Sequence, residues 1–309
     1  EPQLFAFVQK LCRATGAPMP AEIRLTMDVN ASASFAGGLR GYLSGALVLE
    51  VGLPLLAGFS VSQLAGTLAH ELGHFAQGAG MRRSGLVRRV NLWFARVVFE
   101  RDAWDRRLES WSELWMVGIV FIGARFVVGC GRLVLHGLML LGVLVAGYVL
   151  RQMEYDADRY ETQVVGSEGF VSTSARIIEL TVWWNGVLED LDHAHRHGRL
   201  PDDLAISLLG QEAQFDPKAV PTVLEAHLEL RTGFFDTHPA QRERNERARA
   251  LGFAPRLTVE EPASVLMADM PALSRSLTAE YYRELLDEES LESLVISSSA
   301  EELARSARA

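Results

Sequence analysis

The sequence predicts a mainly helical α+β fold, in which a small β-sheet supports helices and a long apolar segment interrupts the domain. Apolar residues alternate with polar ones between residues 23 and 29, which is typical of a strand buried on one face. Apolar residues recur at three- and four-residue spacing between residues 61 and 75, which indicates an amphipathic helix. Residues 114–150 carry two arginines and one histidine but no lysine or acidic side chain, as expected of a membrane-inserted or deeply buried helical segment.

The N-terminal elements follow from local patterns. Apolar side chains at helical spacing predict a first helix that ends near Gly16. After the strand at residues 23–29, the glycine-rich stretch 37–41 predicts a flexible or hairpin connection. A second strand is expected around residues 46–51. The two strands would form the small sheet.

The next helix carries the chemistry. Ser60 and Gln63 form a capping box at its start. His70, Glu71 and His74 then read as an HExxH motif. Two side chains four apart lie on one helix face, so both imidazoles can reach one metal ion, with Glu71 about 100° round from His70. This pattern is typical of a zinc-dependent peptidase with glutamate as general base, although a chance match on a buried helix is the alternative.

A third ligand is expected downstream. Glu154 and Asp158 are again four apart and share one helix face. A catalytic zinc requires three protein ligands and one open position, and two histidines with a glutamate form a known set. Asp158 would then accept a hydrogen bond from a ligand histidine and orient its ring. An exposed acidic helix face is the alternative interpretation of this pair.

These residues resemble those of the gluzincin membrane metallopeptidases, the family of the HtpX heat-shock protease, the Ste-type CAAX prenyl protease and the OMA mitochondrial protease. The resemblance rests on HELGH, on ExxxD after an apolar insertion, and on the segment DTHPAQRER at residues 236–244. It also includes Asn30 and Ala31, although Ser32 stands where the family has phenylalanine. It implies a zincin-like peptidase domain that binds one zinc ion per chain through His70, His74 and Glu154.

The resemblance also implies roles for residues outside the two short motifs. His238 would donate a hydrogen bond to the oxyanion or ligate zinc in a resting state, or it faces solvent at a helix start. Arg244 would be a second oxyanion donor or would anchor its segment. An extended substrate would add to an edge strand formed by Leu47, Val48 and Leu49, through main-chain hydrogen bonds. An ordinary core hairpin is the alternative for that strand.

The insertion predicts contact with a membrane. Residues 81–107 alternate arginines with apolar and aromatic side chains, as in a helix at a membrane surface or on the protein core. Residues 114–130 and 133–150 predict a helical hairpin that turns at residues 129–132 and dips through the bilayer, the second arm being 18 residues long. A buried apolar helix pair is the alternative. Arginines flanking the insertion favour a cytoplasmic catalytic face, and the resemblance implies the bacterial inner membrane.

Composition and order divide the chain into parts. The formal net charge of −9 argues against nucleic-acid binding, and two cysteines give no disulfide framework. Residues 1–80 and 151–255 are expected to form the metallopeptidase core, residues 81–150 the apolar insertion, and residues 256–309 a C-terminal extension. Because the sequence begins with Glu1 and not methionine, we expect a processed or excised piece of a longer chain.

The function expected from these features is a membrane-associated zinc endopeptidase that cleaves peptides or proteins, for example in membrane protein quality control. The glutamate of the helix motif would activate a water molecule on the metal. One alternative is a membrane scaffold or holdase with a latent or structural zinc site. Another is a soluble zincin in which the apolar run is core.

Overall fold

The computed structural model describes residues 1–36, 46–76, 118–230, 232, 239–287, 291 and 294–299. These residues are mostly helical with two small sheets, which confirms the predicted balance of helix and strand. They fall into two compact units, which we describe separately. The larger unit contains Glu1–Ala76, Tyr155–Arg231 and Ala240–Ala309, and the smaller contains Gln77–Glu154 and Thr232–Pro239.

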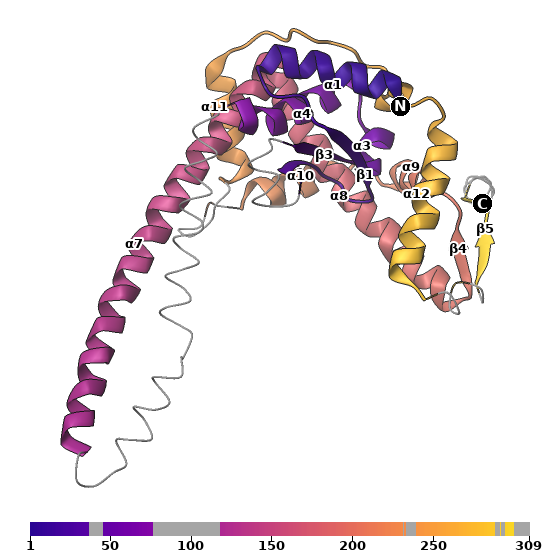
Figure 1. The fold of residues 1–309 in the computed structure, drawn as a ribbon. Coiled ribbons are helices and arrows are strands. Elements are labelled where there is room, and N and C mark those ends of the chain that lie inside the picture. The colour runs from indigo at the N-terminus through magenta and orange to yellow at the C-terminus, as the bar shows by residue number, and fades with distance from the viewer. Residues whose placement is uncertain are drawn as a thin grey trace. The chain divides into compact units, whose positions relative to one another are not determined.

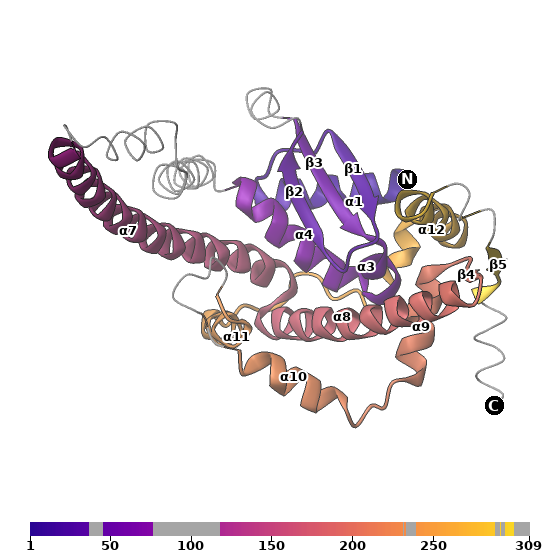
Figure 2. The same ribbon diagram turned by 90° about the horizontal axis from the view of Figure 1, so that it is seen from below.

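The main sheet of the larger unit has three strands in the order β1-β3-β2. Strands β1 (Glu22–Thr26) and β3 (Leu47–Gly52) are parallel, with Ile23 opposite Leu49. Strand β2 (Ala31–Phe35) runs antiparallel to β3. Figure 2 shows β3 between its two neighbours. The sheet therefore has β1 and β2 at its edges.

This order corrects one prediction. Leu47, Val48 and Leu49 were expected on an edge strand, but β3 is hydrogen-bonded to a strand on each side. Their side chains are at most 2% exposed. A strand buried on both faces is a continuous apolar run rather than an alternating one, and LVLEV fits that description except at Glu50. An edge role for these three residues is therefore wrong.

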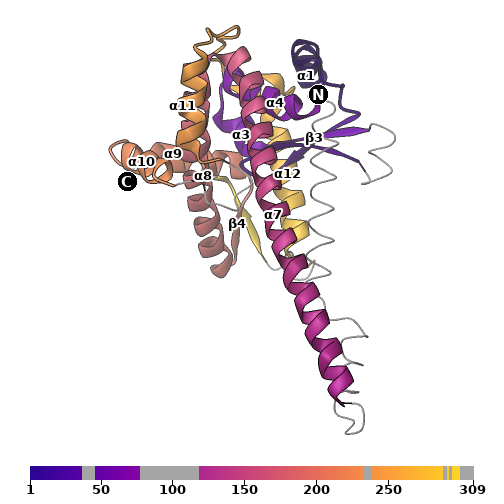
Figure 3. The same cartoon turned by 90° about the vertical axis from the view of Figure 1, so that its left-hand side faces the viewer.

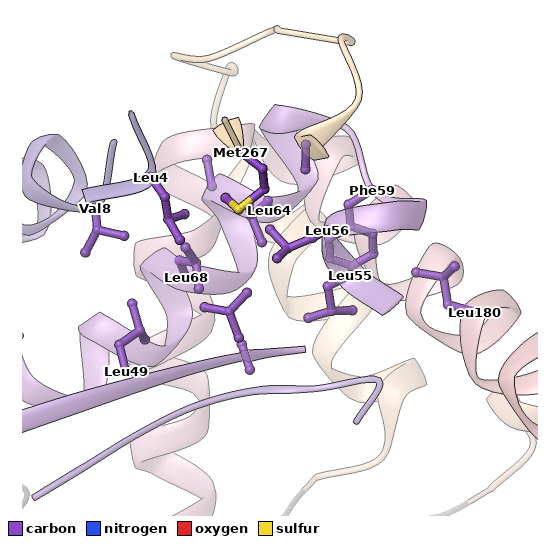
Figure 4. Close-up of a cluster of buried hydrophobic side chains, with 14 of the residues drawn as sticks. Leu4, Val8, Leu49, Leu55, Leu56, Phe59, Leu64, Leu68, Leu180 and Met267 are labelled. Carbon is purple, nitrogen blue, oxygen red and sulfur yellow. The ribbon is translucent and has the colours of Figure 1, made fainter. Parts of the chain in front are cut away.

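Helices cover this sheet and form the core with it. Helix α1 (Pro2–Thr15) packs against α4 (Val61–Ala76), and α4 contacts β2. The short helix α3 (Leu53–Gly58) follows β3 directly. The predicted capping box is confirmed: the Ser60 amide donates to Gln63 Oε1 at 2.9 Å and the Gln63 amide donates to Ser60 Oγ at 3.3 Å. Figure 4 shows Leu64 and Leu68 of α4 among the apolar side chains of the core.

A second helical layer follows. Helix α8 (Ser167–Arg196) packs against α4, α9 (Leu204–Gln214) and α11 (Gln241–Leu251). Figure 3 shows α11 near the N-terminal part of α8, and Figure 2 shows α10 (Val220–Leu228) close to both. Strands β4 (Arg199–Pro201) and β5 (Val295–Ser297) pair in parallel (Figure 1).

The segment after α11 ties several helices together. Its backbone bonds the end of α7 at Val164, through Arg256 and Leu257, and the start of α4 at Val61. The 3-10 helix η1 (Ala263–Leu266) and α12 (Met270–Leu285) then follow. Within this segment, Pro262 forms an isolated β-bridge with Ser60 at the start of α4.

Helix α7 (Gly118–Val165) corrects a second prediction. A turn was expected at residues 129–132, yet the helix continues through them without interruption. Glycine in a helix costs only about 1 kcal/mol relative to alanine, and no proline breaks this run. The two expected arms of the hairpin are therefore one helix at this point. The predicted amphipathic helix at residues 81–107 lies outside the described residues.

The part of α7 in the smaller unit is apolar and exposed. A segment at Phe126–Val165 is the one helix long and apolar enough to cross a membrane among the described residues, with mean hydropathy 2.3 over 18 residues. Only 17% of that window is buried. Phe126, Leu133 and Leu141 expose 72%, 73% and 59% of their surface. This single helix suggests membrane association only weakly.

Candidate metal centre

Glycines allow α4 and the end of α7 to approach closely. A Cβ added at Gly73 would lie 2.7 Å from Tyr160 Cδ2, and one added at Gly66 would lie 3.0 Å from Val165 Cγ1. Side chains of α7 therefore rest directly on the backbone of α4 at both positions. This packing turns the His70 face of α4 toward the acidic face of α7.

His70 meets Asp158 at this contact. Its Nδ1 lies 3.1 Å from Asp158 Oδ1, and the two residues are only 8% and 4% exposed. With the ring proton on Nδ1, the imidazole turns that proton toward the carboxylate and leaves the Nε2 lone pair available. That tautomer is the one a metal-ligating histidine requires, and carboxylates commonly orient such rings.

Arg244 of α11 holds Asp158 from the other side. The guanidinium donates through Nη2 to Oδ1 at 2.6 Å and through Nε to Oδ2 at 3.0 Å. Burial alone would raise the pKa of the Asp158 carboxyl, but Arg244 and His70 hold that pKa below its ordinary value. The carboxylate is therefore charged at neutral pH, and its position is set by a two-point contact.

Further contacts dock α11 next to this pair. Tyr155 donates from its hydroxyl to Glu243 Oε2 at 3.1 Å, and Arg247 lies 3.7 Å above the Tyr155 ring. Gln241 donates from Nε2 to Ser174 Oγ of α8 at 2.8 Å. Helix α11 is thus attached to both α7 and α8, which places the guanidinium of Arg244 where it meets the carboxylate.

The three expected ligands present their atoms together. One ring nitrogen each of His70 and His74 and one carboxylate oxygen of Glu154 lie within 4.8 Å of one another. The two imidazole rings are 5.0 Å apart between centroids and nearly perpendicular, at 89°. Glu154 lies one helical turn before Asp158 on α7. Two nitrogens and one oxygen at this spacing suit a zinc ion with an open fourth position.

Glu161 is a buried residue that the sequence patterns did not single out. It is 5% exposed, and its Oε2 lies 3.8 Å from His70 Nδ1. Burial raises the pKa of its carboxyl to about 7, against the attraction of His70. Its spacing of three residues from Asp158 puts it on the same helix face, so the helical pattern contained a signal that could have identified it.

The structure describes some of the remaining predicted site residues and not others. Glu71 and His74 are half-buried on α4. His238 lies outside the described residues, so both roles suggested for it stay predictions. Arg244 contacts Asp158, which agrees with the anchoring alternative and gives the guanidinium a protein partner. The proposed edge strand is central, as described above.

Comparison with known proteins gives one family. A sequence model of peptidase family M48 matches residues 1–251 of this chain. The match includes every helix that carries a candidate ligand and ends with α11. No solved structure matches the chain.

Proposed function

Because the chain belongs to peptidase family M48, we propose that it is a membrane-associated zinc endopeptidase with His70, His74 and Glu154 as ligands. Family membership itself implies a zinc-dependent metallopeptidase that acts on peptide or protein substrates. The observation that carries the ligand assignment is the convergence of these three side chains within 4.8 Å. When bound, zinc supplies a Lewis acid for the scissile carbonyl and lowers the pKa of water.

Glu71 acts as the general base and then as the general acid. It follows His70 on α4, about 100° further round the helix, and is half-buried. It accepts a proton from the attacking water and delivers it to the nitrogen of the leaving amine. Attack by water needs such a proton acceptor, because the water loses a proton as its oxygen bonds to the carbonyl carbon.

Asp158 and Arg244 position the ligand His70. The arginine holds the carboxylate through hydrogen bonds from Nε and Nη2, and the carboxylate lies 3.1 Å from His70 Nδ1, where it favours a proton on that nitrogen. Their contribution is orientation and basicity of the ligand, not contact with substrate.

Strand β2 is the better candidate for the substrate edge. It borders the sheet next to α4, and Phe35 of β2 meets Phe75 of α4 with ring centroids 5.3 Å apart. An extended peptide at this edge would pair its main chain with β2, as in other cases of strand addition. Ser32, which stands where the resemblance expects phenylalanine, donates to Glu50 Oε2 at 3.0 Å. That hydrogen bond links β2 to β3, and the small Ser32 side chain takes the place of the bulky phenylalanine.

The membrane attachment uses the apolar part of α7. Residues 133–150 rise about 27 Å as a helix, close to the thickness of the hydrocarbon layer. Several of its large apolar side chains are exposed, including Leu133 at 73% and Tyr148 at 61%. Arg151 and the arginines at residues 82–107 favour a cytoplasmic catalytic side. The bacterial inner membrane is the location we propose.

The test compares purified wild type with Glu71→Gln in cleavage of casein, with zinc measured in both. We expect about one zinc per chain in each protein and a loss of turnover of about two orders of magnitude or more in the variant. Glu225→Gln is the matched control, because Glu225 is exposed on α10. Zinc in both proteins without cleavage by either would favour a scaffold with a latent site. Equal cleavage by both would overturn the role of Glu71.

A further inference from the structure

Apart from the candidate metal centre, the larger unit contains a pocket among α1, the start of α4, the end of α7 and the segment after α11. Its volume is about 340 Å³, within the range of small-molecule sites. The segment after α11 is the gold trace near α1 in Figure 1. It supplies Arg256 and Leu257 to the pocket, and both residues lie beyond the range matched by the family.

The walls of this pocket are apolar. Phe7 and Leu11 of α1 line it together with Val164 of α7 and Leu257. Some polar groups of the wall already have partners: the Thr15 hydroxyl donates to Leu11 O at 2.9 Å, and the amides of residues 256 and 257 donate to Val164 O. A ligand with many polar groups would leave them without partners here, which costs free energy.

Two positively charged side chains line this apolar pocket. Lys10 and Arg256 both line it and are exposed. Neither forms an ion pair within the part of the chain that the structure describes. Lysine is rare in this sequence, which has one other at residue 218, and the chain carries a net charge of −9. Two unpaired cations beside one apolar pocket in an acidic protein are complementary to an anion with an apolar body.

We propose that this pocket binds a single-chain fatty acid, with its carboxylate at Lys10 and Arg256 and its acyl chain between α1 and α7. An acyl chain needs only apolar contact with the walls. A peptide would bring main-chain amides, and the apolar walls offer these amides few hydrogen-bond partners. The carboxylate accepts charge-assisted hydrogen bonds from the ammonium and the guanidinium. Both parts of the ligand therefore find a complementary surface.

One residue of the pocket wall packs against α4, the helix that carries two of the candidate ligands. Tyr160 lines the pocket and also rests on Gly73 of α4. A bound acyl chain would support Tyr160 against α4 and so stabilise the contact between the two helices that carry the ligands. Fatty acid binding should therefore raise the melting temperature of the chain in a concentration-dependent way.

The experiment uses dodecanoate with a photoreactive diazirine near the end of its chain. The full chain is labelled, digested and mapped by mass spectrometry, which locates the ligand even when apolar parts of α7 also bind it. We expect labels on the walls from α1, α7 and the segment after α11. Excess plain dodecanoate should compete, whereas dodecyltrimethylammonium, which has the same chain and the opposite charge, should not.

Two variants test the pocket and its charges. Ala14→Trp fills the pocket from an exposed wall position, and Ala6→Trp, exposed on the same helix outside it, is the matched control. Lys10→Glu with Arg256→Glu should lower labelling at the pocket about tenfold or more. Lys218→Glu with Arg275→Glu makes the same change of charge elsewhere and should leave labelling unchanged.

Three results would overturn the proposal. Labels confined to residues 126–150 of α7 would show that only the apolar helix binds the probe. Equal labelling of the pocket in Ala14→Trp and wild type would place the ligand elsewhere. Equal competition by the cationic amphiphile would remove the role of Lys10 and Arg256. None of these readouts depends on peptidase activity, so they are independent of the zinc assignment.

Discussion

Helix α7 has two parts with opposite patterns of exposure. Toward its C-terminus, Asp158 and Glu161 are 4% and 5% exposed although both are carboxylic acids. Toward its N-terminus, Leu133 and Leu141 are 73% and 59% exposed although both are apolar. In a protein surrounded only by water, both patterns would cost free energy, because carboxylates are more stable in water and large apolar side chains are more stable when buried.

The difference is explained by what surrounds each part. The buried acids have charged neighbours, since Arg244 and His70 both contact Asp158. The exposed leucines have few protein neighbours, which suits contact with lipid. One continuous helix therefore combines a polar segment that organises a site with an apolar segment to which we assign the proposed membrane attachment.

The largest effect is expected at the ion pair between Asp158 and Arg244. Asp158→Asn removes the charge opposite Arg244 and leaves a largely buried guanidinium without its partner. We expect a loss of about 3 kcal/mol in the free energy of unfolding and zinc binding about 10- to 100-fold weaker. Urea unfolding and zinc titration measure the two. Asp156→Asn, exposed on the same helix, is the control and should change stability by less than about 0.5 kcal/mol.

The next largest effect is expected in the apolar part of α7. Leu141→Arg places a charge where we propose lipid, at a cost of about 2.5–3.5 kcal/mol in membrane insertion. The fraction of protein recovered with membranes should fall. Leu230→Arg is the control, because Leu230 is 63% exposed in the larger unit and should stay neutral. Unchanged membrane recovery of the Leu141 variant would favour a protein partner for this surface.

The smallest effect compares two glycines. Gly73→Ala adds a methyl group 2.7 Å from Tyr160 and should cost about 1–3 kcal/mol of stability through overpacking. Gly137→Ala lies in the apolar part of α7, with nothing within 4 Å of the added carbon, and should stabilise the helix by up to about 1 kcal/mol. Thermal unfolding measures both. A neutral Gly73 variant would mean that α4 and α7 are not closely packed.

The errors and successes of the sequence predictions have different physical origins. The capping box at Ser60 and the helix that it starts were predicted correctly, because both depend on hydrogen bonds between neighbours in sequence. The edge position of Leu47, Val48 and Leu49 was wrong, because strand order depends on which distant segments pair. The turn at residues 129–132 was wrong because glycine permits a turn without requiring one.

The sequence by itself determined the chemistry of the protein. The residue types of His70, Glu71, His74 and Glu154, and the four-residue spacing that puts His70 and His74 on one helix face, indicate a zinc peptidase before any contact is known. Tertiary structure alone decided what surrounds them. Arg244 reaches Asp158 across 86 residues of sequence, and Glu161 is buried only because α4 packs against its face of α7. Helix periodicity is local, whereas burial and charge pairing depend on segments that meet only after folding.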